Sequence, residues 1–166
     1  MDLNIITGLL IFFLMVYMIY SRGKMFVEHK KGLETVSHRG NFQKIFTGKI
    51  NLAVYATALV AALVGLIVFY INRTQYDNYL AWMLVFAVII ITASTDMLRT
   101  YVLYTTYYND NGIYHDTEYI RYSSIKNFKP KRIPITTDVY LFNGDMHTMP
   151  TKALQFLEKR IVAKKK

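Results

Sequence analysis

The stretch that decides the fold is residues 51–103. It opens with LAVYATALVAALVGLIVFYI at 52–71 and continues, after a polar bend, with YLAWMLVFAVIIITASTDM at 79–97. The first run has no charged residue, and the second carries one acid, Asp96, near its end. A bilayer's hydrocarbon core is about 30 Å thick and needs ~20 apolar residues at ~1.5 Å per residue. Both runs meet this need, so we expect a transmembrane helical hairpin over residues 51–104.

A third apolar run covers residues 3–20 and predicts a further span. A signal peptide would have a positively charged start and a small-residue cleavage site. Here only Met1 and Asp2 precede the run, and the sequence YSRGK at 20–24 follows it. We therefore expect residues 1–20 to form a retained first transmembrane helix.

The distribution of charge predicts how the spans are oriented. The chain has 166 residues, of which 53% are hydrophobic, and a net charge of +9. Residues 21–50 hold seven Lys and Arg against two acids, and residues 105–166 hold eleven against six. Basic segments next to spans stay on the cytoplasmic side. We expect a bacterial plasma-membrane protein with its N-terminus outside and its C-terminus in the cytoplasm. This setting explains the charge without nucleic acid as a partner.

Residues 21–50 are predicted to form a basic cytosolic loop, because four glycines interrupt any long helix there. Two alternatives stay open for this segment. It can lie on the membrane surface, with Phe42 and Phe46 in the interface and neighbouring lysines on lipid phosphates. It can also dock a partner protein.

Residues 105–166 change from apolar runs to short alternating segments typical of strands. Strands are expected at residues 105–109, 112–115, 118–122, 124–129, 136–142 and 145–149. Asn143-Gly144 predicts a type I′ hairpin turn between the last two. A helix from Lys152 to about Ala163 follows, with apolar residues recurring every three or four positions. We predict a small cytosolic antiparallel sheet capped by this helix, and hence a membrane protein of the α+β class.

The order of these elements resembles that of the YobD-like family of small bacterial membrane proteins. The C-terminal part also resembles bacterial pleckstrin-homology-like modules. Eight residues carry the likeness: Gly112, Ile113, Tyr114, Tyr119, Ile120, Tyr122, Ser123 and Ile125. The resemblance implies an accessory role beside a mannose-type phosphotransferase sugar permease. It carries over no catalytic residue.

Two groups of charged residues are candidates for contact with a partner or with lipid. Asp96 and Arg99 are three residues apart and share a helix face. They predict either an ion pair at the end of a span or a partner-contact site. The second group is Lys126, Lys129, Lys131 and Arg132. These residues can bind an anionic leaflet or can simply set topology and solubility.

Motifs of catalysis are not found in the sequence. There is no Cys, the four His make no metal-binding pattern, and neither a G-x-S-x-G elbow nor a phosphate loop is present. We expect no enzyme, metal or cofactor. Three functions remain: an accessory or regulatory subunit binding another membrane protein, a sensor of anionic lipid, and a small oligomeric transporter or channel.

Overall fold

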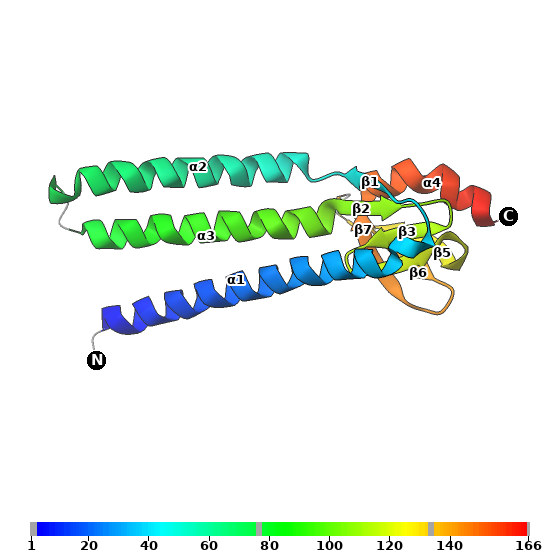
Figure 1. The fold of residues 1–166 in the computed structure, drawn as a ribbon, viewed down its shortest axis with the longest axis horizontal. Coiled ribbons are helices and arrows are strands. Elements are labelled where there is room, and N and C mark those ends of the chain that lie inside the picture. Colours follow the sequence, from blue (N-terminus) through cyan, green and yellow to red (C-terminus); the bar gives the residue numbers. More distant parts are fainter. Residues whose placement is uncertain (1–2, 76–77, 133–134, 166) are drawn as a thin grey trace. The chain divides into compact units, whose positions relative to one another are not determined.

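The computed structural model describes residues 3–75, 78–132 and 135–165, so residues 1–2, 76–77, 133–134 and 166 lie outside it. Three long helices dominate it: α1 (Leu3–Val36), α2 (Lys49–Ile71) and α3 (Tyr79–Tyr104) (Figure 1). All three are long and apolar enough to cross a membrane. The chain divides into two compact units, one of residues 1–26 and 50–99, the other of residues 27–49 and 100–166. We call the second unit the β module.

Helix α1 does not end at Tyr20 as the sequence predicted. It continues to Val36, so the expected loop at 21–50 is helical over about half of its length. A helix of 34 residues is about 51 Å long at ~1.5 Å per residue, which exceeds the thickness of a bilayer core. Residues 27–36 accordingly belong to the β module. A glycine inside a helix costs only about 1 kcal/mol, and packing at Gly32 offsets this cost.

Within the first unit, α2 and α3 pack through a small residue and a group of rings. A Cβ at Gly65 would lie 2.5 Å from the ring of Phe86, so only glycine allows this approach. Phe69 contacts both Trp82 and Phe86, with ring centroids 5.6 and 5.3 Å away. Small residues at helix contacts are typical of membrane proteins. Most other apolar side chains of these helices are exposed among the described residues, as expected of surfaces that face lipid.

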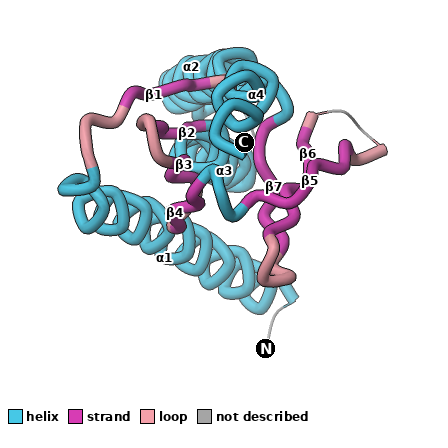
Figure 2. The backbone as a smooth tube through the Cα atoms, turned by 90° about the vertical axis from the view of Figure 1, so that its right-hand side faces the viewer, coloured by secondary structure: helices cyan, strands magenta, loops and turns pink. Residues whose placement is uncertain are grey.

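The β module contains two antiparallel sheets, where the sequence predicted one. The first has the order β1 (Gln43–Phe46), β2 (Thr105–Tyr108), β3 (Gly112–His115), β4 (Glu118–Arg121). The second has the order β5 (Ile125–Pro130), β6 (Thr136–Leu141), β7 (Met146–Pro150). Figure 2 shows these two groups of strands in magenta. The expected strands after residue 105 are confirmed. The sequence missed β1, which comes from the supposed loop and pairs with β2.

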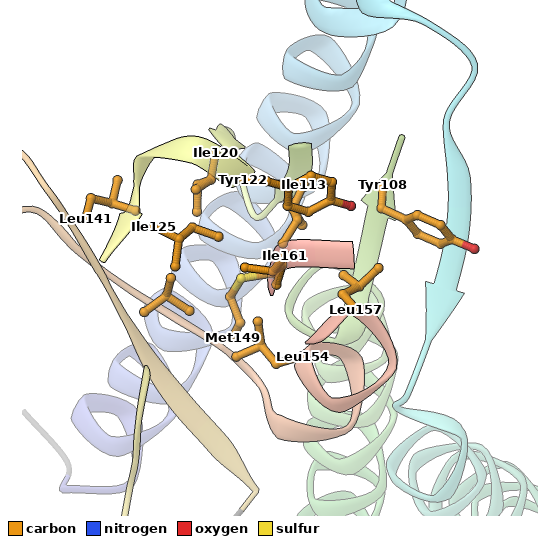
Figure 3. Packing of buried hydrophobic residues seen from close by; sticks show 11 residues of the cluster. Tyr108, Ile113, Ile120, Tyr122, Ile125, Leu141, Met149, Leu154, Leu157 and Ile161 are labelled. Carbon is orange, nitrogen blue, oxygen red and sulfur yellow. The ribbon is translucent and has the colours of Figure 1, made fainter. Parts of the chain in front are cut away.

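The two sheets and helix α4 (Thr151–Lys165) share one hydrophobic core (Figure 3). Tyr108, Ile113 and Ile120 come from the first sheet, and Val139 and Met149 come from the second. The apolar face predicted for the C-terminal helix is confirmed. Its buried members are Ala153, Leu154, Leu157 and Ile161. Each fully buried Leu or Ile stabilises the fold by about 1.5–3 kcal/mol relative to an exposed one. Burial of these side chains therefore holds α4 against the sheets.

The hairpin turn between β6 and β7 is not the predicted type I′ turn. That type requires positive φ at both central residues, and here Gly144 has φ of +96° whereas Asn143 does not have a positive φ. The Gly144 amide donates to the Leu141 carbonyl (3.2 Å), and the Leu141 amide donates to the Asp145 carbonyl (2.9 Å). This is a three-residue loop with glycine in the left-handed position. The local sequence identified the turn but not its length.

Gly32 tests whether α1 belongs to the β module. A Cβ there would lie 2.3 Å from the hydroxyl oxygen of Tyr114, a fully buried side chain. We expect Gly32→Ala to destabilise the module by about 1–3 kcal/mol, because overpacking outweighs the gain in helix propensity. Gly23→Ala on the same helix is the control, since nothing lies within 4 Å of its Cβ. Thermal unfolding in detergent measures both, and equal or higher stability of Gly32→Ala would contradict the packing.

Candidate functional site

Asp96 is paired with a different arginine from the one that the sequence suggested. Its Oδ1 lies 3.9 Å from Nε of Arg22 on α1, so the pair joins two helices instead of two turns of α3. Arg99 is exposed and forms no ion pair with a carboxylate in the described part of the chain. Both members of the pair are partly exposed, and the Arg22 Nε is buried without a hydrogen-bond partner. The pair holds α1 against α3 and keeps one donor unsatisfied.

Phe42 and Phe46 pack within the β module. Phe42 directly precedes strand β1 and Phe46 is its last residue. The Phe42 ring lies 6.1 Å from that of Tyr119 and the Phe46 ring 6.3 Å from that of Tyr101, measured between ring centroids. Both side chains are half-buried. Backbone pairing of β1 with β2 fixes this segment at the edge of a sheet. The reading of residues 21–50 as a solvated loop is therefore wrong, and the contacts of both rings lie inside the folded module.

Three of the four predicted basic residues gather at one turn. Lys129, near the end of β5, lines a pocket of about 640 Å³ together with Lys131 and Arg132 of the connection to β6. We call these three residues the basic turn. Lys126 lies at the opposite end of β5 and does not line this pocket.

One acid faces the basic turn. The Nζ of Lys131 lies 3.2 Å from Oδ1 of Asp138 and 3.1 Å from the Thr148 hydroxyl. The Thr148 hydroxyl donates to Asp138 (2.7 Å), and this bond together with Lys131 lowers the pKa of Asp138. The charge of Lys131 is therefore balanced by Asp138. The net positive charge of the basic turn comes from Lys129 and Arg132.

The basic turn lies at the end of the module where α3 enters it. Leu103 and Tyr104, the last residues of α3, line a second pocket of about 380 Å³ together with Thr136 and Pro150. Thr136 opens β6 and directly follows the connection that carries the basic turn. Thr136 thus connects the pocket of the basic turn with a pocket at the C-terminal end of a candidate membrane span.

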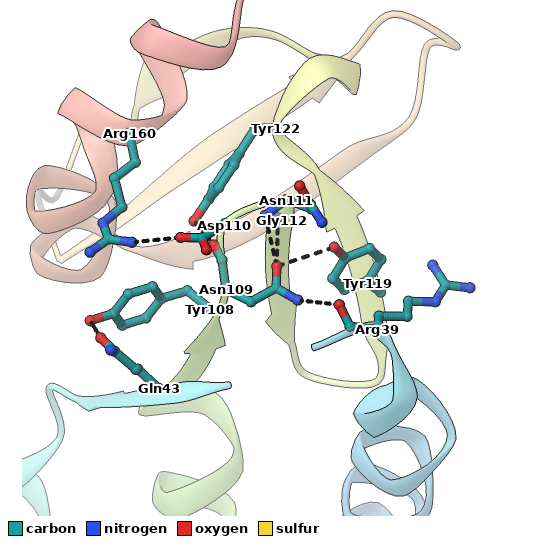
Figure 4. A network of polar contacts seen from close by, with 10 residues as sticks. All are labelled: Arg39, Gln43, Tyr108, Asn109, Asp110, Asn111, Gly112, Tyr119, Tyr122 and Arg160. Carbon is teal, nitrogen blue, oxygen red and sulfur yellow. Dashed lines mark hydrogen bonds and ion pairs between the residues drawn. The ribbon is translucent and has the colours of Figure 1, made fainter. Parts of the chain in front are cut away.

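A polar network at the β2–β3 turn is a feature that the sequence reading missed (Figure 4). Asn109 is buried, and its Oδ1 accepts from the amides of Asn111 and Gly112, both at 2.9 Å. Its Nδ2 donates to the carbonyl of Arg39 (3.1 Å), seventy residues away in the chain. Tyr122 donates its hydroxyl to the Asn109 carbonyl (3.1 Å), and burial raises the pKa of Tyr122 to about 12. The sequence NDNG at 109–112 signalled the turn but not its long-range partner.

A second group of buried polar contacts surrounds His29. His29 on α1 is only 2% exposed, and its ring lies among those of Tyr101, Tyr107 and Tyr114. Its Nδ1 contacts the Asp116 carbonyl, and the Tyr114 hydroxyl donates to the His29 carbonyl (2.7 Å). Burial raises the pKa of Tyr114 to about 12. These contacts fasten α1 to the first sheet.

Within the described residues, no three His, Asp or Glu side chains are placed to hold a metal ion. Comparison of the chain with models of protein families, with curated proteins and with solved structures finds no match. What supports a function is consequently the geometry of the basic turn, of the Arg22–Asp96 pair and of the polar network around Asn109.

The burial of His115 predicts that the stability of the module depends on pH. It is 6% exposed, and its Nδ1 lies 3.1 Å from the Thr106 hydroxyl and 3.2 Å from the Thr105 carbonyl. Burial lowers the pKa of His115. The unfolded chain takes up this proton below about pH 6.5, whereas the folded chain resists it, so stability is lost as the pH falls. We expect the Tm to decrease between about pH 7.5 and 5.5, measured by thermal unfolding.

His115→Gln is expected to flatten this dependence. His38→Gln is the matched control, because it removes an exposed histidine by the same substitution. Equal slopes in the two variants would exclude His115 as the source.

Proposed function

We propose that this protein is a non-enzymatic accessory protein of the bacterial plasma membrane whose β module contacts anionic headgroups through the basic turn. The observation that carries the proposal is that Thr136 lines a pocket with the basic turn and also a pocket with Leu103 and Tyr104, the end of α3. The excess of five positive charges in each of residues 21–50 and 105–166 supports a cytosolic module and an outside N-terminus.

The expected strength of this contact suits a sensor of lipid composition. A basic residue near an anionic leaflet contributes about 1 kcal/mol, and the effect decays within about 10 Å. Lys129 and Arg132 together contribute about 2 kcal/mol to binding of the leaflet. Lys131 is left out of this sum because it forms an ion pair with Asp138. The spans already hold the module at the membrane, so this energy is available to set its orientation. The module then binds the leaflet when anionic lipid is abundant and releases it when salt is high.

The absence of cysteine in the chain allows a direct test. A fluorophore that reports membrane contact is attached at Ile135→Cys, an exposed position next to the basic turn. In nanodiscs with about a third of phosphatidylglycerol at low salt, we expect the probe to report contact that is lost at high salt. Lys129→Gln with Arg132→Gln is expected to abolish the contact.

Two controls sharpen this test. A probe at Phe142→Cys, exposed in the β6–β7 turn, reports general effects of lipid on the module. Lys126→Gln removes one charge from the other end of β5. Contact at Ile135→Cys that is independent of anionic lipid would contradict headgroup recognition.

A second function, binding another membrane protein through the spans, is favoured by the Arg22–Asp96 pair. The Arg22 and Asp96 side chains are 27% and 20% exposed, so a polar group from a neighbouring helix can reach the pair. The resemblance to the YobD-like family suggests a mannose-type phosphotransferase permease as this neighbour.

Co-purification from native membranes in mild detergent tests the second function. We expect such a permease to be recovered in a fixed ratio with the wild-type chain and to be reduced several-fold with Asp96→Asn. Thr57→Val, an exposed change on α2, is the control for altered spans, because the Thr57 hydroxyl donates within its own helix, to the Ala53 carbonyl (2.9 Å). Recovery of the wild-type chain without a permease would rule out this partner.

A further inference from the structure

A polar pocket of about 620 Å³ lies beside the Asn109 network in the β module. Its lining consists of two guanidinium groups, one amide and several hydroxyls. The residues are Arg39, Asn111, Tyr119, Arg121, Tyr122 and Ser123. No carboxylate is among them, and the volume lies within the range of about 300–1,000 Å³ typical of sites for small molecules.

Hydrogen bonds of the Asn109 side chain fix the backbone that forms the pocket. One side-chain amide ties the Arg39 carbonyl to the β2–β3 turn, so the end of the η1 turn (Ser37–Arg39) is joined to the sheet. The guanidinium of Arg39 stacks 4.8 Å from the centre of the Tyr119 ring. Tyr119 also reaches Asn109 Oδ1 with its hydroxyl (3.4 Å). The first arginine of the pocket is therefore held at both its backbone and its side chain.

The two arginines of the pocket lack a counter-charge within the described residues. Arg39 and Arg121 are exposed, and neither forms an ion pair with a carboxylate there. A nearby acid, Asp110, is paired with Arg160 of α4 at 3.6 Å. The pocket consequently presents two positive charges that its own surroundings leave unbalanced.

We propose that this pocket binds the phosphate group of a small soluble phosphorylated compound. A phosphomonoester carries close to two negative charges at neutral pH, which match the two guanidinium groups. Guanidinium groups bind phosphate oxygens in pairs of hydrogen bonds, a geometry that lysine does not provide. The Ser123 hydroxyl and the Asn111 amide supply further hydrogen bonds, and the ring of Tyr119 offers a surface for the rest of the ligand.

The position of the pocket favours a soluble ligand over a lipid headgroup. Strand β2 leaves α3 at Thr105, paired with Phe46, and reaches the pocket's end of the sheet at Tyr108, paired with Gln43. Four residues of strand span about 13 Å at ~3.3 Å each. The basic turn lies at the α3 end of the module, so the two positive sites lie at opposite ends.

The test measures thermal unfolding of the full chain in nanodiscs of zwitterionic lipid, with inorganic phosphate and phenyl phosphate as probes at constant ionic strength. Binding to the folded state raises the Tm in a saturable way. We expect saturation by phenyl phosphate at a lower concentration than by phosphate. Arg121→Gln is expected to raise the half-saturating concentration at least tenfold.

Two matched variants make the result specific. Arg132→Gln removes the same charge at the basic turn and is expected to leave saturation unchanged. Arg121→Lys keeps the charge and is expected to restore only part of the affinity. If Arg39→Gln unfolds the module, Arg121→Gln alone decides, because the Arg121 side chain is exposed.

Three outcomes would overturn the proposal: no shift up to about 20 mM probe, equal saturation in Arg121→Gln, or loss of saturation when anionic lipid is added. The last would identify a headgroup as the occupant. Since Arg132→Gln weakens headgroup contact but not phosphate binding, failure of this site and failure of the proposed function are distinguishable.

Discussion

The architecture of the β module depends on one close contact, the packing of Tyr114 against Gly32. The tyrosine ring is fully buried, and its hydroxyl donates to the His29 carbonyl one turn earlier in α1. Any larger residue at position 32 would occupy the space of this hydroxyl. The contact makes the last ten residues of α1 a part of the soluble core. It thereby fixes where the chain emerges at Ser37 and where β1 can begin.

The consequences of this contact reach the site at the far end of the sheet. Because α1 lies against β3, the η1 turn falls beside the β2–β3 turn, within reach of the Asn109 side chain. Arg39 then lines a pocket whose other residues come from the β2–β3 turn, from β4 and from the η3 turn (Tyr122–Ser124). A loop free in solution would have to be ordered before it could place a guanidinium there, at about 1–2 kcal/mol per residue. Folding the helix into the module removes this cost.

The spans and strands could be predicted from the sequence because their signals are local. Twenty apolar residues define a span, and alternation defines strands such as Thr136–Leu141, whatever else the chain does. The extension of α1 was missed because its evidence is not local. Gly23 and Gly32 looked like breaks, and only Tyr114, more than eighty residues later, explains why a glycine is required at the second position. Strand β1 was missed for the same reason, since four residues read as a strand only beside β2.

The candidate sites also differ in whether their evidence is local in the sequence. The basic turn was visible because Lys129, Lys131 and Arg132 are neighbours in sequence. Pairing of Lys131 with Asp138 was not visible, because it runs across the β5–β6 hairpin. The pocket of Arg39 and Arg121 could not be found, since its two charges come from segments eighty residues apart. Charge that neighbours in sequence share tends to face a broad surface such as a leaflet. Charge that folding brings together around a hollow is suited to one small anion, and this difference separates the two ends of the module.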